Sequence, residues 1–285
     1  MKTILALVLV NSLFGIGYPL VKTIVHYLTP AQWVFVRVLS SSLILLVFQG
    51  KALFSHPITL KQFGGLVLAA FLGITLNQIC FVEGLYRSTS GHAAIINATI
   101  PLQTILLAWL FGKEKIQPLE CLGIACGLVG VGILLQVQNI GVFNPFLKGD
   151  LFVLINATSY SLFLIFAKQT LESFSPMLAL TWISLLSVVG TGWYAGWSLP
   201  LSTILHLPPK LWLYMLYLIT FQSIVTYYAN IWALKRVEAS HAAIFVYLQP
   251  VIATILAYTM LGDLPQGHFY LSAGLIFVGI VLGSL

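Results

Sequence analysis

The chain has 285 residues, of which 59% are hydrophobic and only 7% are charged. Soluble domains carry about 25% charged residues, so this composition excludes a protein whose main solvent is water. The net charge of +6 comes from basic residues scattered singly between apolar runs. That pattern argues against nucleic-acid binding and favours anchors in the loops between membrane spans.

Apolar stretches free of charged residues follow one another along the chain. A bilayer span needs about 20 apolar residues, and nine charge-free stretches have 17 residues or more. They cover residues 3–21, 62–82, 88–112, 121–147, 151–167, 173–209, 211–234, 239–262 and 264–285. A tenth stretch, about 30–50, is equally apolar but contains Arg37. In 173–209, Pro200, Pro208 and Pro209 favour one span followed by a loop. We therefore predict an all-α integral membrane protein with ten transmembrane helices; nine or eleven remain alternatives.

The first apolar run and the basic residues predict the orientation. The run from 3 to 21 is longer than a signal-peptide core and lacks a small-residue cleavage site, so we expect it to be retained as a helix. Eight basic residues fall on the side of the two termini and four on the other. The eight are Lys2, Lys51, Lys61, Lys113, Lys115, Lys168, Lys235 and Arg236; the four are Lys22, Arg87, Lys148 and Lys210. Because Lys and Arg are enriched in cytoplasmic loops, both termini are expected in the cytoplasm.

The sequence contains an internal repeat. Residues 85–95 align with 234–244 at a shift of 149, which matches His92 with His241 and, further on, Pro101 with Pro250. Lys22 matches Lys168 at a shift of 146. We therefore predict two domains, 1–138 and 148–285, of five helices each. An odd number of spans inverts the second half relative to the first. Inverted repeats recur in secondary transporters, whose solute site lies near mid-membrane between the repeats.

A motif in each half resembles the EamA-type repeat of the drug/metabolite transporter superfamily. It reads Gly84-Leu85, Ala93-Ala94, Pro101 and Gly112-Lys113-Glu114, and again Ala233-Leu234, Ala242-Ala243, Pro250 and Gly262-Asp263. The resemblance covers nearly the whole chain. It implies a ten-helix carrier of the inner (plasma) membrane that moves small metabolites, often outward, by alternating access through a central cavity. Relatives range from amino-acid exporters to exchangers of nucleotide sugars or sugar phosphates, so the substrate stays open.

Neutral polar and aromatic side chains within the spans are candidates for lining that cavity. Polar groups in lipid must face a cavity, a partner helix or an interface, and several of these fall on one helical stripe. The candidates are Asn11, Tyr18, Asn77, Gln78, Asn97, Gln103, Asn156, Tyr160, Gln222, Thr226, Asn230 and Tyr247, with Tyr227 and Gln249 nearby. Such groups suit amphipathic organic solutes. The alternative is interhelical hydrogen bonding.

A second set of residues is predicted to serve gating or structure. It comprises Lys22, Arg37, Glu83, His92, Pro101, Lys168, His241 and Pro250. We expect Arg37 to be satisfied by carbonyls or by a polar partner on another helix; binding of a substrate anion is the alternative. Glu83 and Arg87 have the spacing of an i, i+4 ion pair, with proton coupling by Glu83 as the alternative. His92 and His241 would either cap their helices or latch gates on opposite sides. The prolines permit bends because they lack a backbone donor.

Motifs for catalysis or metal binding are missing from the sequence. It contains no His-Glu-x-x-His, no Gly-x-Ser-x-Gly and no phosphate loop, so no enzyme activity, metal or cofactor is predicted. Glu114, Asp150, Glu172, Glu238 and Asp263 are expected at helix ends, which leaves no carboxylate deep in a span and predicts exchange or weak proton coupling. The expected partners are a small-molecule substrate and the lipid bilayer, without nucleic acid; a homodimer is left open. A membrane assembly partner without transport activity is the remaining alternative.

Overall fold

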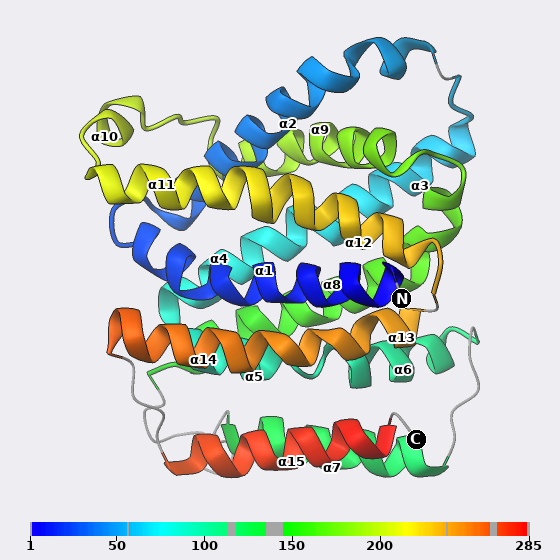
Figure 1. Cartoon of the computed structure of the whole chain (residues 1–285), viewed down its shortest axis with the longest axis vertical. Helices are drawn as coiled ribbons and strands as arrows, with labels where there is room; N and C mark the ends of the chain where they lie inside the picture. The colour runs from blue at the N-terminus through cyan, green and yellow to red at the C-terminus, as the bar shows by residue number, and fades with distance from the viewer. Residues whose placement is uncertain are drawn as a thin grey trace.

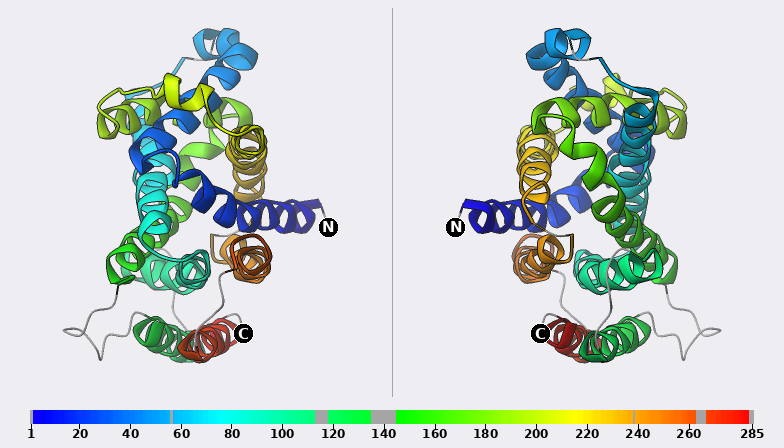
Figure 2. Two further views of the ribbon diagram at one scale, coloured as in Figure 1. Left: turned by 90° about the vertical axis from the view of Figure 1, so that its left-hand side faces the viewer. Right: turned by 90° about the vertical axis from the view of Figure 1, so that its right-hand side faces the viewer.

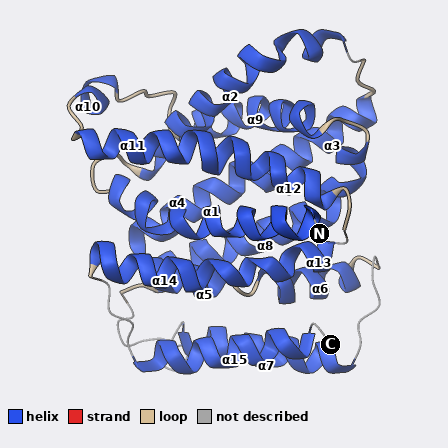
Figure 3. Cartoon of the chain, in the orientation of Figure 1, coloured by secondary structure: helices blue, strands red, loops and turns tan. Residues whose placement is uncertain are grey.

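The computed structural model describes residues 2–55, 57–112, 118–134, 145–237, 239–262 and 267–283. Within these ranges every regular element is a helix and no strand occurs (Figure 3). This agrees with the predicted all-α class. A chain in hydrocarbon must satisfy its backbone hydrogen bonds within each segment, and a helix does so.

The first half contains helices in five consecutive runs. The first two are α1 (Lys2–Ile24) and α2 (Pro30–Ser55). The third is continuous and consists of α3 (Leu60–Ala70), the π-helical η1 (Phe71–Thr75) and α4 (Leu76–Arg87). The fourth is broken into α5 (Ser90–Asn97) and α6 (Ile100–Leu110), and the fifth is α7 (Pro118–Leu134).

The second half has a similar series. It begins with α8 (Leu147–Glu172) and α9 (Pro176–Tyr194), followed by the short α10 (Leu201–Leu205). A continuous run then comprises α11 (Pro209–Tyr217), the π-helical η3 (Leu218–Val225) and α12 (Thr226–Leu234). The last runs are α13 (Ala239–Ile244), the 3₁₀ turn η4 (Phe245–Tyr247) and α14 (Leu248–Leu261), and finally α15 (Gly267–Gly283).

Six helices in the described ranges are long and apolar enough to cross a membrane. They are Lys2–Ile24, Pro30–Leu53, Leu60–Arg87, Ser90–Leu110, Leu147–Glu172 and Pro176–Tyr194. Shorter apolar helices cover Cys121–Gly130, Phe245–Leu261 and Phe269–Gly279. Each of these helices falls on a predicted apolar stretch. The stretch 173–209 holds one long helix and then a loop, as its prolines predict.

Proline marks the break in the fourth run. α5 ends at Asn97, and Pro101 occupies the first turn of α6, where its missing donor leaves no bond unmade. Pro250 likewise lies in the first turn of α14, directly after the 3₁₀ turn. Pro19, in contrast, lies inside α1, which continues past it to Ile24.

The long helices run side by side in the orientation of Figure 1, with α2 and α9 toward one end of the long axis and α7 and α15 at the other. α7 packs against α15, α2 against α9, α1 against α14, and α4 against α8. The side views in Figure 2 show the same pairing of α7 with α15. Large apolar side chains such as Val47 and Trp193 remain more than 80% exposed on the outside, as expected for a surface that contacts lipid.

A close contact between the end of α4 and the first turn of α8 depends on a glycine. A Cβ added at Gly149 would lie 2.7 Å from the backbone carbon of Arg87 and 2.7 Å from the backbone nitrogen of Ser88. Backbone atoms cannot move aside as a flexible side chain can, so this position admits only glycine without a shift of α8.

We expect Gly149→Ala to lower the free energy of unfolding by about 1–3 kcal/mol, the usual range for overpacking. Gly64→Ala is the matched control, because a Cβ there meets nothing within 4 Å. Alanine should be neutral or stabilising at that helical position. Thermal unfolding of both variants in detergent measures the difference. Equal melting temperatures would contradict the close packing of α8 on the turn before α5.

Candidate functional site

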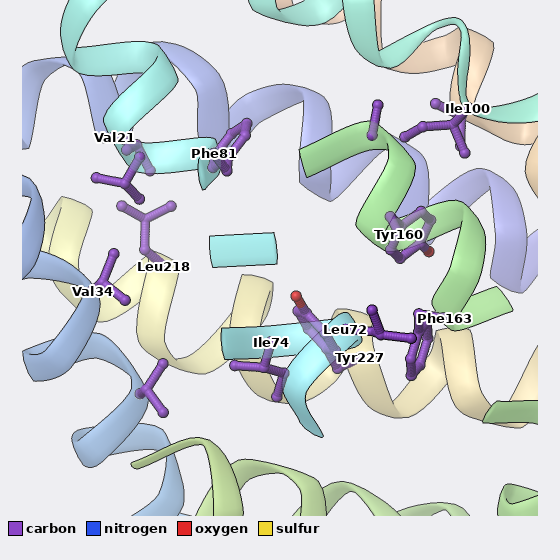
Figure 4. Close-up of a cluster of buried hydrophobic side chains, with 14 of the residues drawn as sticks. Val21, Val34, Leu72, Ile74, Phe81, Ile100, Tyr160, Phe163, Leu218 and Tyr227 are labelled. Atoms are coloured by element: carbon purple, nitrogen blue, oxygen red, sulfur yellow. The ribbon is translucent and has the colours of Figure 1, made fainter. Parts of the chain in front are cut away.

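A central cavity lies between helices of both halves. Thirteen residues line about 440 Å³ of empty space, counting the part that is open to solvent. They are Phe14 and Tyr18 of α1, Arg37 of α2, Asn77, Gln78 and Phe81 of α4, Asn97 of α5, Ile100 of α6, Asn156 and Tyr160 of α8, Gln222 of η3, Tyr227 of α12 and Gln249 of α14. Figure 4 shows Phe81, Ile100, Tyr160 and Tyr227 among the buried side chains of this region.

Seven of the twelve predicted cavity residues line this space: Tyr18, Asn77, Gln78, Asn97, Asn156, Tyr160 and Gln222. The other five hold structure around it. Asn11 accepts a hydrogen bond from Gln249 (2.7 Å), and Asn230 donates to the hydroxyl of Tyr160 (2.8 Å). They therefore support lining residues from behind.

The remaining three predicted residues form contacts with their own or neighbouring helices. Gln103 accepts a hydrogen bond from the hydroxyl of Thr158 at 2.8 Å, which joins α6 to α8. Tyr247 packs its ring against Phe277 at 6.4 Å between centroids. Thr226 is fully buried and donates to the carbonyl of Phe221 at 2.9 Å.

The π-helical segment η3 explains why Thr226 was misplaced. The sequence prediction assumed regular α-helical spacing, which puts Gln222, Thr226 and Asn230 on one face of the helix. In the structure Gln222 and Tyr227 line the cavity, five residues apart, because η3 runs to Val225 with hydrogen bonds to the fifth preceding residue. The wider turn moves the cavity-facing position by one residue.

Hydrogen bonds across the halves join the cavity walls. The Tyr18 hydroxyl donates to Gln249 Oε1 (2.9 Å) and accepts from Asn97 Nδ2 (2.7 Å). Asn156 Nδ2 donates to the carbonyl of Asn77 at 3.0 Å, and Asn77 Nδ2 to the carbonyl of Asn156 at 3.4 Å. The interhelical bonding foreseen as the alternative role is thus present in the same residues that face the cavity.

Arg37 also lines the cavity. Its side chain is only 2% exposed. Nε donates to Ser223 Oγ at 2.7 Å, and Nη1 donates to Gln78 Oε1 at 2.8 Å. Both acceptors lie on other helices, as predicted, but the guanidinium lies at the cavity wall rather than away from it.

Phe14, Phe81 and Ile100 were not predicted as cavity residues. In an apolar chain they are indistinguishable from the many aromatic and aliphatic residues that face lipid or the core. Tyr227 and Gln249 lie beside predicted cavity residues in the sequence, and both line the cavity. A polar group within an apolar span is the signal that could have found these two.

Two lysines from matching positions in the repeat bond to backbone carbonyls. Lys22 Nζ donates to the carbonyls of Leu85 (2.7 Å) and Ser88 (2.6 Å), in the last turn and at the C-cap of α4. Carbonyls at a helix C-terminus lack intrahelical donors and carry partial negative charge, so the Lys22 cation is stabilised there. Lys168 Nζ donates to the carbonyl of Val237 at 3.0 Å, in the segment between α12 and α13.

Of the two roles expected for His92, capping of α5 belongs to another residue. Thr89 caps α5, because its side chain accepts the backbone N–H of His92 at 3.0 Å. The His92 ring instead lies 3.0 Å from Asp150 Oδ2, and Ser88 donates to Asp150 Oδ1. His92 is 6% exposed and Asp150 0%. The side chain of His241 lies outside the described residues.

Asp150 lies at a helix end, as predicted. It is in the first turn of α8, where the helix dipole favours a negative charge. Its complete burial by neighbouring helices was not predicted. Glu172 is exposed at the end of α8. Glu114, Glu238 and Asp263 lie outside the described residues.

The predicted ion pair between Glu83 and Arg87 is present. Tyr194 of α9 also donates its hydroxyl to the Glu83 carboxylate. Glu83 therefore has two partners, one from each half of the chain. In the part of the chain that the structure describes, no group of three His, Cys, Asp or Glu side chains could hold a metal ion.

We expect Asp150→Asn to destabilise the protein by about 1–3 kcal/mol, because it weakens the acceptor for two buried donors, Ser88 and His92. Glu172→Gln, at an exposed position, should change stability by less than about 0.5 kcal/mol. Thermal unfolding of these two variants, of His92→Gln and of the double variant His92→Gln/Asp150→Asn provides the test. If His92→Gln and Asp150→Asn had strictly additive effects, the two side chains would not interact in solution.

Comparison with known proteins agrees with this architecture. The model of the EamA-like transporter family matches residues 1–136 and again 147–285. The uncharacterized transporter YdfC of Bacillus subtilis (strain 168) is 25% identical over 95% of this chain and 87% of its own length. The uncharacterized inner membrane transporter YedA of Escherichia coli (strain K12) is 28% identical over 98% of this chain and 90% of its own.

The fold also has a counterpart among solved structures. A protein crystal structure that is 16% identical in sequence matches with a TM-score of 0.59 over 95% of both chains. At that identity the match shows the fold alone. The family match covers both halves of the chain, and the apolar helices are long enough to span a bilayer. The chain therefore belongs to the EamA-like transporter family and is a membrane transporter.

Proposed function

We propose that this protein is a secondary transporter of the inner membrane that moves a small organic solute by alternating access through the central cavity. The observation that carries the proposal is the composition of the cavity wall. Helices of both halves contribute to it, and it combines neutral amide groups with aromatic rings. The inner-membrane location follows the description of YedA.

Mirrored helix contacts support ten spans arranged as two inverted repeats, 1–138 and 148–285. When each run is matched with its counterpart in the other half, the α1–α14 contact corresponds to α8–α6, and α1–α12 corresponds to α8–α4. The pairs α2–α9 and α7–α15 correspond to themselves. A twofold relation between the halves accounts for all four.

Local features repeat in the same way. The π-helical segments η1 and η3 occupy the middle of the third run of each half. Lys22 bonds to the carbonyl of Ser88, and Lys168 bonds to that of Val237, which is the residue that aligns with Ser88 at a shift of 149. α1 begins and α15 ends toward the same side of Figure 1, as an even number of crossings requires.

The bonds from Asp150 and Glu83 hold one end of the molecule closed in this proposal. Ser88 and His92 of the first half bond to Asp150 of the second, and Tyr194 of the second half bonds to Glu83 of the first. Opening the cavity at this end would separate both pairs. His92 thus acts as a latch in the gate rather than as a cap. At the shift of 146, the counterpart of Asp150 is Ile4, so this carboxylate has no equivalent in the first half.

Reporter fusions test the inverted arrangement. A reporter joined after Leu147 and one joined after Leu285 should report opposite sides of the membrane, with the second in the cytoplasm, because five spans separate the two sites. Activity and fluorescence reporters with opposite side requirements provide the reading. The same side for both fusions would exclude the inverted repeat.

Cysteine labelling with flux measurement tests the cavity. The three native cysteines, of which Cys121 is exposed, are first replaced. Asn77→Cys and Asn156→Cys should then react with small polar thiol reagents, whereas Thr226→Cys, fully buried outside the cavity, should react at least about tenfold more slowly. A solute that slows this labelling is then tested for flux into sealed liposomes. Flux of that solute would distinguish a transporter from a membrane assembly partner. Equal labelling of Thr226→Cys, or no flux, contradicts the proposal.

A further inference from the structure

The cavity contains a positive charge that none of the carboxylates whose side chains the structure describes balances. Arg37 is almost completely buried, and its hydrogen-bond acceptors, Gln78 and Ser223, are both neutral. Lys22 and Lys168, by comparison, bond to backbone carbonyls, and Arg87 pairs with Glu83. Arg37 differs from these residues because it lies in the cavity wall and, among the described side chains, its partners are neutral.

The three carboxylates whose side chains the structure describes are engaged or exposed elsewhere. Glu83 bonds to Arg87 and Tyr194, and Asp150 bonds to His92 and Ser88. Glu172 lies exposed at the end of α8. None of the three lines the cavity. A charge removed from water without a counter-ion is strongly disfavoured, and a bound anion would relieve this penalty.

We propose that the Arg37 guanidinium binds the carboxylate of the transported solute, which makes the cavity selective for organic monoanions. The inference rests on the proposed transport function and adds the substrate class to it. A guanidinium presents its N–H donors in a planar fork that matches a carboxylate. Gln78 and Ser223 hold Nη1 and Nε from the protein side, so the fork is oriented before the solute arrives.

The size of the charge favours a carboxylate over a phosphate. A phosphate ester carries about −1.5 to −2 charges at neutral pH, whereas Arg37 is the one Lys or Arg among the lining residues. A phosphate would therefore leave negative charge unbalanced in a site of low dielectric. A single carboxylate balances the guanidinium and leaves the loaded cavity neutral.

The other residues that line the cavity indicate what the solute carries besides its carboxylate. Phe14 and Tyr227 form an edge-to-face pair at 5.8 Å between centroids, and Tyr18 and Phe81 form another at 5.1 Å. All four line the cavity, and their rings suit a flat or bulky apolar group. The solute is thus an aromatic or similarly apolar carboxylate.

Two lining side chains also have acceptors without a donor. Asn97 Oδ1 and Gln222 Oε1 are buried and receive no hydrogen bond from any described residue; Asn97 is only 4% exposed and Gln222 only 2%. Buried polar atoms in native proteins almost always have a partner. A hydroxyl or N–H group on the solute would supply the donor.

Binding of matched probes to the purified protein tests this site. The probes are 3-(4-hydroxyphenyl)propionate, the corresponding amide, and 3-phenylpropionate, which lacks the hydroxyl. A ligand that binds the folded state raises the melting temperature. We expect the hydroxy acid to bind at least about tenfold more tightly than its amide, as loss of a charged hydrogen-bond partner implies, and more tightly than 3-phenylpropionate.

Variants then assign the preference to Arg37. Arg37→Gln should remove the preference for acid over amide, and Arg37→Lys should retain part of it. Gln78→Glu leaves Arg37 in place but supplies an internal carboxylate, so it should weaken acid binding at least about tenfold even if Arg37→Gln does not fold. Arg236→Gln is the matched control, because Arg236 is exposed and lies over its neighbour Trp232, outside the cavity. It should bind as the unaltered protein does.

Three results would overturn the anion site: equal binding of acid and amide, a preference that survives both Arg37→Gln and Gln78→Glu, or equal competition by chloride, which would indicate a site for inorganic anions. If the acid binds through Arg37 but no probe crosses the membrane of liposomes, the anion site stands and the proposed transport function is wrong. If the amide and the acid cross at equal rates, the transport function stands and the proposed selectivity for anions is wrong.

Discussion

The need to satisfy every backbone hydrogen bond away from water determines how this chain can depart from regular helix. Where a helix breaks or widens, carbonyls lose their usual donors, and lipid offers no replacement. Side chains of other helices add donors at these places. Ser161 of α8 donates to the carbonyl of Ile100 (3.1 Å), the first residue of α6 after the break. Ser159 donates to the carbonyl of Leu72 (2.7 Å) and Tyr227 to that of Gly73 (3.2 Å), both within η1. Irregular helix and the contact between halves therefore depend on each other.

Hydrophobicity and proline positions predicted the helices well because both act locally. α1, α8 and α9 each coincide with an apolar stretch that is recognised from the sequence alone. The same reasoning found seven cavity residues, since an amide or phenol within an apolar span has few places to lie other than a cavity or an interhelical contact. Which of the two it occupies depends on helices far away in the sequence, and that part could not be predicted.

Among the charged residues, too, contacts within one helix could be predicted from the sequence and contacts between distant segments could not. The pair Glu83–Arg87 follows from spacing along one helix. The pair His92–Asp150 joins residues 58 positions apart, and nothing in the residues around Asp150 distinguishes it from an exposed first-turn carboxylate. Arg37 was correctly expected to find polar partners on other helices. Its position at the cavity wall depends on how α2, α4 and η3 pack together, which hydropathy does not describe.

The π-helical segments have a consequence for comparing this chain with its relatives. Each residue of an α-helix turns the chain by about 100°, so a widened turn that accommodates an additional residue leaves all later side chains in a different phase from those before it. A relative that lacks the widened turn at Leu218–Val225 would align correctly only with a one-residue gap in the middle of a hydrophobic helix. Gaps are usually assigned to loops. An alignment without this gap would equate Tyr227 with a residue on another face of the helix, and an apparent difference in the cavity would be an error of register.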